Sequence, residues 1–237
     1  MSAEGTAKRV GIMQPYFFPY IGYYQLVNAV DTFVFYDDVN YMKKGWINRN
    51  RILINGKPAY LTASLQGVSQ NRMICEIALS DNRTQLLKTI ELAYRKAPFF
   101  AETMEPVEQV LTRPVKHIGQ LAMHSVTAIM DHLGLSRDYR VSSNDFAHTR
   151  PLPRADRLIA ITKECGSAHY INAIGGRELY DKLYFGRKKV RLSFLEPSIE
   201  EYRQYNMPFQ PGLSVIDLLM LNGRVKGREM AEDYNLI

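Results

Sequence analysis

The amino-acid sequence predicts an α/β fold with a Rossmann-like, mostly parallel sheet and a helical insert. Segments with strand and helix patterns alternate near the start of the chain and again in its last third, which is the order of βαβ units. Between them, residues 84–134 carry apolar residues at helical spacing. The 237 residues, 46% of them hydrophobic, suffice to bury one sizeable core. We therefore expect a single α/β domain over residues 1–237, with residues 84–134 as a helical insert.

The start of the chain has the pattern of one βαβ unit. Residues 9–13 form a short apolar run that stops at Gln14-Pro15, as a buried strand does before a proline. Residues 22–30 suit a short helix, and residues 32–36 are β-branched and aromatic. Because a short helical crossover joins neighbouring parallel strands, we predict that these two strands are adjacent and parallel.

The middle of the chain predicts a hairpin followed by helices. Segments 51–54 and 59–63 flank Asn55-Gly56, a dipeptide that favours a tight hairpin turn. Residues 73–78 have the composition of one more strand. The helical pattern of residues 84–134 follows, and prolines divide it into separate helices.

The last third of the chain returns to alternating strands and helices. The predicted strands cover residues 139–142, 168–173 and 190–194, and the predicted helices cover residues 156–166, 177–185 and 214–221. Ser214 is a natural N-cap, and Asp217 can complete a capping box three residues later. This alternation favours a parallel sheet, with the central helices lying over one of its edges.

Cysteine content and hydropathy point to the cytoplasm. Cys75 and Cys165 are far apart and form no CxxC pair, which disfavours a disulfide scaffold or a cysteine zinc site. The first residues contain no apolar signal segment, and no apolar run is long enough to span a bilayer. No metal-ligand spacing of the HExxH type occurs either, so the sequence identifies no metal and no cofactor.

The net charge of +6 has two interpretations. It is typical of a basic protein surface, and it also suits a polyanionic partner such as a nucleotide-linked substrate or a nucleic acid. The basic residues are spread along the chain and form no Lys/Arg-rich tail, which favours the first interpretation.

The first candidate site is the segment 14–26, which follows the first strand. Ligands of open α/β sheets bind at the carboxyl ends of strands, where a helix N-terminus also offers free amides to an anion. Gly22 permits a close approach of the backbone, and Gln14, Tyr20 and Tyr23 carry polar groups there. The alternative is a hydrophobic wedge, to which we assign the neighbouring phenylalanines.

This segment has the layout of the nucleotidyltransferase superfamily, in which a strand leads through a proline loop into an HxGH motif. The corresponding positions are Tyr20-Ile21-Gly22-Tyr23, so both histidines are absent. The layout supports a Rossmann-like fold, and the missing histidines argue against adenylyl transfer.

Two carboxylates and one histidine are the candidate catalytic residues. Asp37 and Asp38 close the second predicted strand, where either could act as a base, bind a ribose hydroxyl or hold a metal. Since neighbouring side chains on a strand point to opposite faces, only one of them can face a given site. A solvated turn is the alternative. His148 lies in a polar stretch and is the one histidine that we consider as a catalytic base.

Two further clusters are candidate substrate-binding groups. After Trp46, two amides and two guanidinium groups follow one another in Asn48, Arg49, Asn50 and Arg51. They suit a diphosphate or carboxylate clamp, with the indole stacked on a base or a sugar. Asn172, Gly175 and Gly176 lie between a strand and a helix, where glycines can cradle a phosphate or simply allow the helix to pack.

From residue 9 onward, the chain resembles the WbqC-like family. The resemblance rests on six segments in the same order and spacing: Gln14-Pro15, Tyr20–Tyr23, FVFYDDV (33–39), NRNRI (48–52), YRKAPFF (94–100) and residues 209–219. The family implies a role in making O-antigen, capsule or a related bacterial glycoconjugate. It also suggests a transferase that modifies an amino-sugar, for example by N-acyl or aminoacyl transfer.

Two functions therefore remain open. The first is a transferase that acts on a nucleotide-activated or lipid-linked sugar, with a carrier protein, coenzyme A or an aminoacyl-tRNA as the acyl donor. The second is a non-catalytic module that binds the same nucleotide-sugar for a partner enzyme. For both, we expect Gln14, Tyr23, Asp38, Arg49 and Asn50 to converge on one cleft.

Overall fold

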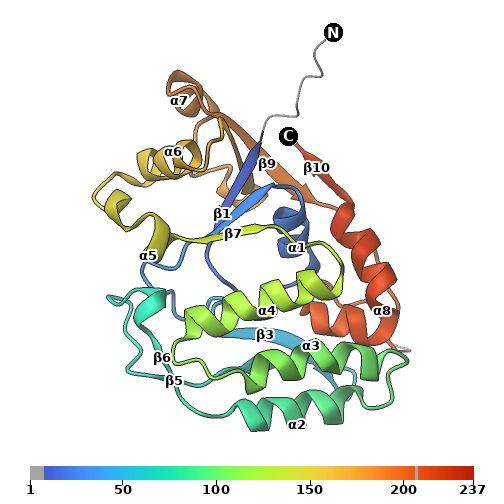
Figure 1. Cartoon of the computed structure of the whole chain (residues 1–237). Coiled ribbons are helices and arrows are strands. Elements are labelled where there is room, and N and C mark those ends of the chain that lie inside the picture. Colours follow the sequence, from blue (N-terminus) through green and yellow to red (C-terminus); the bar gives the residue numbers. More distant parts are fainter. Residues whose placement is uncertain (1–7, 206–207) are drawn as a thin grey trace.

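A six-stranded sheet forms the centre of the fold, in the order β10-β9-β8-β1-β2-β7 (Figure 1). The computed structural model describes residues 8–205 and 208–237. Five strands are parallel, and β10 pairs antiparallel with β9, so the prediction of a mostly parallel sheet is confirmed. The strands are β1 (Arg9–Met13), β2 (Thr32–Phe35), β7 (Asp138–Val141), β8 (His169–Ala173), β9 (Arg191–Pro197) and β10 (Tyr234–Leu236).

Strands β1 and β2 are adjacent and parallel, as the sequence predicts. Their register runs from Val10 opposite Thr32 to Met13 opposite Phe35. Helix α1 (Ile21–Asn28) connects them. All four residues of β2 are buried, which explains why the apolar run of Phe33, Val34 and Phe35 does not alternate with polar residues.

Helices cover both faces of the sheet. Phe33 and Phe35 belong to one hydrophobic cluster, and Val34 between them belongs to the other, as the alternation of side chains on a strand requires. The second cluster packs below α6 (Arg154–Glu164) and α7 (Lys182–Arg187), which Figure 1 shows on the side of the short helix α5 (Ser142–Asp145).

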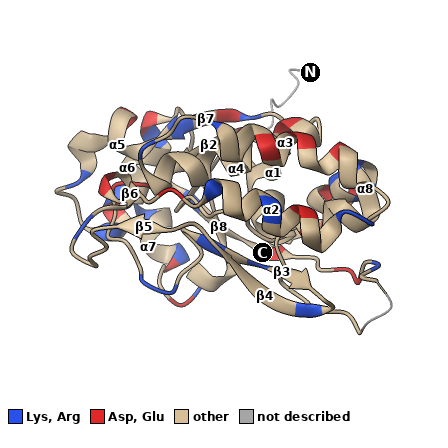
Figure 2. Ribbon diagram, turned by 90° about the horizontal axis from the view of Figure 1, so that it is seen from below, with Lys and Arg blue, Asp and Glu red and all other residues tan. Residues whose placement is uncertain are grey.

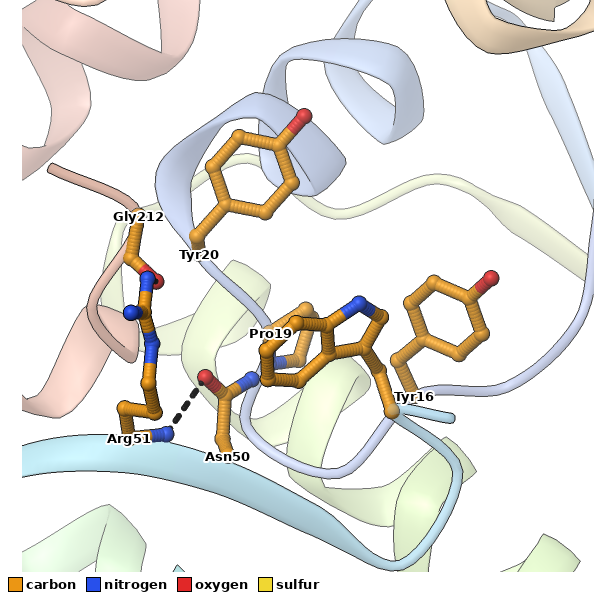
Figure 3. Close-up of a pocket in the computed structure, with 7 residues that line it drawn as sticks. Tyr16, Pro19, Tyr20, Asn50, Arg51 and Gly212 are labelled. Atoms are coloured by element: carbon orange, nitrogen blue, oxygen red, sulfur yellow. Dashed lines mark hydrogen bonds between the residues drawn. The ribbon is translucent and has the colours of Figure 1, made fainter. Parts of the chain in front are cut away.

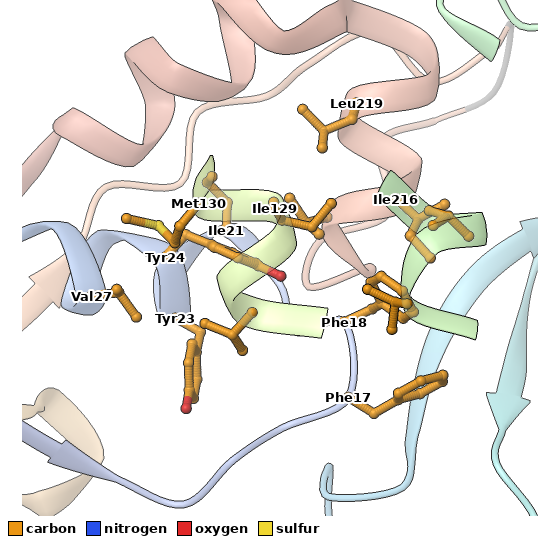
Figure 4. Close-up of a cluster of buried hydrophobic side chains, with 14 of the residues drawn as sticks. Phe17, Phe18, Ile21, Tyr23, Tyr24, Val27, Ile129, Met130, Ile216 and Leu219 are labelled. Atoms are coloured by element: carbon orange, nitrogen blue, oxygen red, sulfur yellow. The ribbon is translucent and has the colours of Figure 1, made fainter. Parts of the chain in front are cut away.

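The larger cluster joins the opposite face of the sheet to the central helices. These are α2 (Arg83–Tyr94), α3 (Phe100–Thr112) and α4 (Ile118–His132), which fill the region predicted to be helical. Figure 4 shows Phe18 of the loop before α1 near Ile129 of α4 and Ile216 of α8 (Val215–Glu232), with Phe17 farther along the same loop. The aromatic loop therefore lies at the junction of three helices, and its phenylalanines are fully buried, as expected.

The predicted hairpin forms outside the central sheet. Strands β3 (Arg49–Ile54) and β4 (Lys57–Thr62) pair with each other around Asn55 and Gly56, whose φ angles are 51° and 74°, as in a type I′ turn. The strand predicted over residues 73–78 is wrong. That segment contains the 3-10 turn η1 (Ile74–Glu76) and only the end of a two-residue pairing between β5 (Leu65–Gln66) and β6 (Ala78–Leu79).

The last helix is longer than the sequence predicts. Helix α8 (Val215–Glu232) contains a break at Gly223, where φ is 76° and an added Cβ would lie 2.7 Å from the ring of Phe99. Ser214 caps the helix, but its own amide donates to the carbonyl of Arg51 at 2.8 Å, so Asp217 completes no capping box. The other predicted elements form within a few residues, except that α7 begins at Lys182, behind the cap Asp181.

Charged residues of both signs lie on elements throughout the ribbon (Figure 2). Within residues 8–205 and 208–237, no helix combines the length and the apolar character needed to cross a membrane.

Candidate functional site

The order of the strands reverses direction at β1. The chain continues from β1 to β2 and β7 on one side, whereas β8 and β9 lie on the other side. In open parallel sheets, such a switch point leaves a crevice at the carboxyl ends of the two central strands, and ligands bind there. A cleft of about 610 Å³ occupies this position, lined by the ends of β1, β2 and β8 and by the start of α6. We call it the switch-point cleft.

The charged side chains that line the switch-point cleft are three arginines, Arg150, Arg154 and Arg157. Two of them surround one carboxylate: Arg150 Nε lies 2.7 Å and Arg157 Nη2 lies 2.6 Å from Oδ2 of Asp38. Arg154 has no ion pair or side-chain hydrogen bond within the described part of the chain. Three guanidinium charges against one carboxylate leave the cleft strongly positive, as an anion site requires.

Asp38 is placed to hold the arginines of the cleft. Its side chain is completely inaccessible to solvent. Burial alone would raise the pKa of Asp38, but hydrogen bonds from Ser142, Arg150 and Arg157 outweigh this effect and lower it. A buried, ion-paired carboxylate with a lowered pKa is a poor proton acceptor. The geometry therefore favours a positioning role for Asp38 over the catalytic role considered from the sequence.

Asp37 faces away from the switch-point cleft. Its carboxylate accepts hydrogen bonds from the backbone N–H of Ser143 at 3.0 Å and from the Ser143 hydroxyl at 2.8 Å. It lines a separate hollow of about 350 Å³, together with Cys75, His117 and His124. Burial raises the pKa of Asp37 in spite of these hydrogen bonds. The two neighbouring carboxylates thus serve different sites, as expected for consecutive residues at a strand end.

The turn after β8 forms another wall of the switch-point cleft. Asn172, Gly175 and Gly176 all line it. A Cβ on Gly176 would lie 2.2 Å from Nδ2 of Asn172, whereas a Cβ on Gly175 would meet nothing within 4 Å. The second glycine is therefore required by the close approach of the asparagine side chain, and the first is not required by packing.

Four other predicted binding residues gather in a smaller space, which we call the aromatic hollow. Tyr20, Trp46, Asn50 and Arg51 line this volume of about 180 Å³. Figure 3 shows Asn50 and Arg51 rising from β3, with Tyr20 at the segment that leads into α1.

Arg51 connects the aromatic hollow to the loop before α8, and Tyr16 separates the hollow from the switch-point cleft. Nη2 of Arg51 donates to the carbonyls of Pro211 and Gly212 at 3.1 and 3.2 Å, and its guanidinium lies 5.9 Å from the ring of Trp46. Tyr16 lines both this hollow and the switch-point cleft, so the two spaces share a wall.

Tyr23 and Gly22 support these sites from within the core. The buried hydroxyl of Tyr23 donates to the backbone carbonyl of Gln14 at 2.8 Å, next to the cleft. A Cβ on Gly22 would lie 2.5 Å from the ring of Tyr20. The two residues therefore place Gln14 and Tyr20 and do not themselves line the cleft or the aromatic hollow.

Asn48, Arg49 and His148 lie outside both spaces. The amide of Asn48 donates to the carbonyl of Ala63 at 2.9 Å, within the base of the hairpin. The guanidinium of Arg49 donates to the carbonyls of Lys44 and Gly45 and covers the ring of Tyr60 at 4.3 Å. His148 is exposed and pairs with Glu164 at 3.0 Å.

The expected convergence on one cleft is therefore partial. Gln14 lines the switch-point cleft and Asp38 holds its arginines, while Asn50 lines the neighbouring aromatic hollow. Tyr23 and Arg49 line neither space.

Sequence reasoning missed the arginines of the cleft. Their spacing contains a signal, since Arg150, Arg154 and Arg157 follow one another at intervals of four and three around the start of α6. Cations in the first turn of a helix oppose its dipole and are stabilised when an anion lies nearby. A cluster of arginines on both sides of a Pro-Leu-Pro segment at a helix start is therefore a pattern that indicates an anion site.

Comparison with known proteins identifies the family to which the chain belongs. The chain is 25% identical over 217 residues to the protein named Uncharacterized protein Rv1507c of Mycobacterium tuberculosis, covering 90% of this chain and 93% of that protein. No solved structure matches the chain. The profile of the WbqC-like protein family matches residues 14–229, a range that contains the residues lining both the aromatic hollow and the switch-point cleft from Gln14 onward. The chain therefore belongs to the WbqC-like protein family.

Proposed function

We propose that the switch-point cleft binds a nucleotide-linked sugar and that the protein is a transferase modifying this sugar in the building of bacterial surface polysaccharide. The observation that carries the proposal is the placement of three arginines, without a lining carboxylate, at the switch point of the sheet. A Rossmann-like fold with a nucleotidyltransferase-like layout is part of the proposal, and the strand-loop-helix path from β1 to α1 supports it.

The geometry of the arginines suits a diphosphate. Asp38 fixes Arg150 and Arg157, so part of the cost of ordering them is met before a ligand arrives. Planar guanidinium groups match phosphate oxygens in a bidentate way. Tyr36 and Tyr180 add aromatic surface to the same cleft, on which a base or a sugar ring can pack. The volume of about 610 Å³ lies in the range of small-molecule sites.

The aromatic hollow provides a second compartment for the reaction. The hollow shares the side chain of Tyr16 with the switch-point cleft, so a donor group in the hollow would lie beside a sugar bound in the cleft. In N-acyl or aminoacyl transfer, the sugar amine would attack the acyl carbonyl, forming a C–N bond and releasing the carrier thiol or hydroxyl with the amine proton. A carrier protein, coenzyme A or an aminoacyl-tRNA would supply the acyl group.

One observation favours the alternative of a non-catalytic binding module. Within the described residues, the lining of the switch-point cleft contains no Asp, Glu, His or Cys side chain. Burial raises the pKa of its tyrosines, including Tyr36 and Tyr180, which makes them poor bases. A module of this kind would hold the nucleotide-sugar for a partner enzyme.

Calorimetric titration of nucleotide-sugars tests the binding proposal. Arg154→Gln should weaken binding by about tenfold or more, the worth of one charge-assisted hydrogen bond, without lowering the melting temperature. Arg191→Gln is the matched control, since Arg191 is exposed at the start of β9 and lines neither space. Equal affinity of the wild type and Arg154→Gln would refute the proposal. Mass spectrometry of bound sugars, incubated with each acyl donor class, separates the transferase from the binding module.

A further inference from the structure

The hollow beside Asp37 lies apart from the switch-point cleft and has no part in the function proposed above. Its wall comes from the end of β2, from η1, from the first two turns of α4 and from the start of α5. Figure 1 shows α5, β6 and the start of α4 on the same side of the molecule. We call this space the Asp37 hollow. It is lined by Asp37, Cys75, His117, Gln120, Met123, His124, Val141, Ser143 and Asn144.

The Asp37 hollow has a negative centre among neutral hydrogen-bonding groups. Asp37 is the one acidic residue that lines it, and no Lys or Arg side chain does so within the described residues. Burial and the nearby Arg113 lower the pKa of His124, which keeps this imidazole neutral at pH 7. Gln120, Ser143 and Asn144 add neutral polar groups. A ligand that enters this space therefore meets one carboxylate and several groups suited to hydroxyls.

Asp37 differs from its neighbour Asp38 in what balances its charge. Asp38 has two guanidinium partners within 2.7 Å. Asp37 is only 2% exposed, but its hydrogen-bond donors are the neutral groups of Ser142 and Ser143, and it has no ion pair within the described residues. Arg150 is close enough for its charge to interact with that of Asp37, but it forms no ion pair with it. A buried carboxylate without an ion-pair partner is unfavourable, and a cation at the open side of the hollow would relieve this cost.

The arrangement does not suit a metal ion. Among the described residues, no group of three or more His, Cys, Asp or Glu side chains is placed to hold one. Burial raises the pKa of the Cys75 thiol to about 11, so the thiolate that metals prefer is disfavoured. An organic ammonium group, which needs only one carboxylate and a few neutral acceptors, fits the same side chains better.

We propose that the Asp37 hollow is a second binding site, which takes a small polyhydroxylated molecule bearing a primary ammonium group, the class to which amino-sugars belong. The ammonium group lies against the Asp37 carboxylate. The hydroxyls of the ligand pair with the neutral polar side chains that surround it. The volume of about 350 Å³ is that of a site for a single small ring.

Imidazole resonances in the wild-type protein test this proposal, with glucosamine as the probe and glucose as its neutral control. Of the five histidines, His117 and His124 line the hollow, and His132, His148 and His169 do not. Glucosamine should shift the signals of the first two and leave the other three in place, and glucose should shift none. Equal effects of the two sugars, shifts of all five signals, or no shift at saturating probe would overturn the proposal.

The two cysteines provide an independent measurement. Burial raises the pKa of both the Cys75 and the Cys165 thiol to about 11, but only Cys75 lines the hollow. Glucosamine should slow the alkylation of Cys75 by iodoacetamide severalfold and leave that of Cys165 unchanged. Unchanged alkylation of Cys75 at saturating glucosamine would count against the site.

Asp37→Asn removes the charge and keeps the shape of the side chain. Glucosamine should bind this variant at least tenfold more weakly, and wild-type affinity in a folded Asp37→Asn protein would refute the role of the carboxylate. If the variant does not fold, the protection of Cys75 in the wild type decides. Nucleotide-sugar binding in the switch-point cleft is measured separately, so the two proposals can fail independently.

Discussion

The guanidinium of Arg157 donates a hydrogen bond of 2.6 Å to the carboxylate of Asp38, although 119 residues separate them in the chain. This contact fastens the start of α6 to the end of β2 across the mouth of the sheet. Both partners are nearly inaccessible to solvent. The contact therefore serves two purposes, since it closes the fold at this edge and fixes a cation in the switch-point cleft.

Replacing Asp38 by asparagine should destabilise the protein strongly. The variant would leave Arg157 buried without a counter-charge, and removing one partner of a buried ion pair costs about 3–5 kcal/mol. Urea denaturation followed by circular dichroism measures the change. Glu164→Gln is the control, because it breaks the exposed pair with His148 and should cost less than about 1 kcal/mol. Similar losses of unfolding free energy in the two variants would show that the buried Asp38–Arg157 pair stabilises the fold no more than an exposed pair does.

Arg49 and Arg51 form a matched pair, because they lie two residues apart on β3 and only Arg51 lines the aromatic hollow. Arg51→Lys should weaken the binding of ligands that enter this hollow by about tenfold, since a lysine cannot reproduce the fork of a guanidinium. Arg49→Lys should leave affinity unchanged and cost about 0.5–1.5 kcal/mol of stability through its lost backbone contacts. Calorimetry and a melting curve for each variant decide. A loss of affinity in Arg49→Lys alone would contradict this assignment and would support the binding role that the sequence predicts for Arg49.

The two glycines after β8 should respond differently to alanine. Gly176→Ala places a methyl group 2.2 Å from the Asn172 amide and should cost about 1–3 kcal/mol, while also moving this side chain in the cleft. Gly175→Ala meets open space and should change stability by less than about 0.5 kcal/mol. Thermal melting of the two variants provides the comparison. Equal melting temperatures would contradict the close contact with Asn172.

Stability should depend on pH through Asp217. Burial raises the pKa of this carboxyl to about 6, against hydrogen bonds from the hydroxyls of Tyr94 and Tyr202. Because the folded-state pKa lies above the unfolded value, the folded state binds the proton more tightly. The contribution of protonated Asp217 to the free energy of unfolding is therefore present at low pH. It is lost as the pH rises from about 4 through about 6.

Asp217→Asn isolates this effect, because its amide can replace the carboxylate between the two tyrosines. The free energy of unfolding of the variant should rise relative to the wild type by on the order of 1–3 kcal/mol between pH 4 and pH 7. Urea denaturation at a series of pH values measures the difference. A difference that does not vary with pH would mean that Asp217 keeps an ordinary pKa.

Local patterns were sufficient to predict most of the secondary structure. The apolar run of residues 9–13 and the Asn55-Gly56 turn depend on neighbouring residues only, and both form as expected. Residues 73–78 fail as a strand because their partners are distant. The amide of Cys75 donates to the carbonyl of Asp37 at 2.9 Å, which favours a tight turn that no local pattern indicates.

The candidate site was predictable in part, for the same reason. Gln14 and the turn at Gly175 follow strands, so the rule for parallel sheets was enough to place them at one edge. The function of Asp38 depends on Arg150 and Arg157, whose approach is fixed by the tertiary fold. A sequence shows a carboxylate at a strand end, and it does not show which distant cations will neutralise it.

The hydroxyl of Ser142 lies within hydrogen-bonding distance of both Asp37 and Asp38. A serine has one hydroxyl proton, so full donation to one carboxylate is withdrawn from the other. Neutralising Asp37, by a proton or by a cation in its hollow, frees that proton for Asp38, whose carboxylate also accepts from Arg150 and Arg157. The Asp37 hollow and the switch-point cleft are thus coupled electrostatically through the one hydroxyl proton of Ser142.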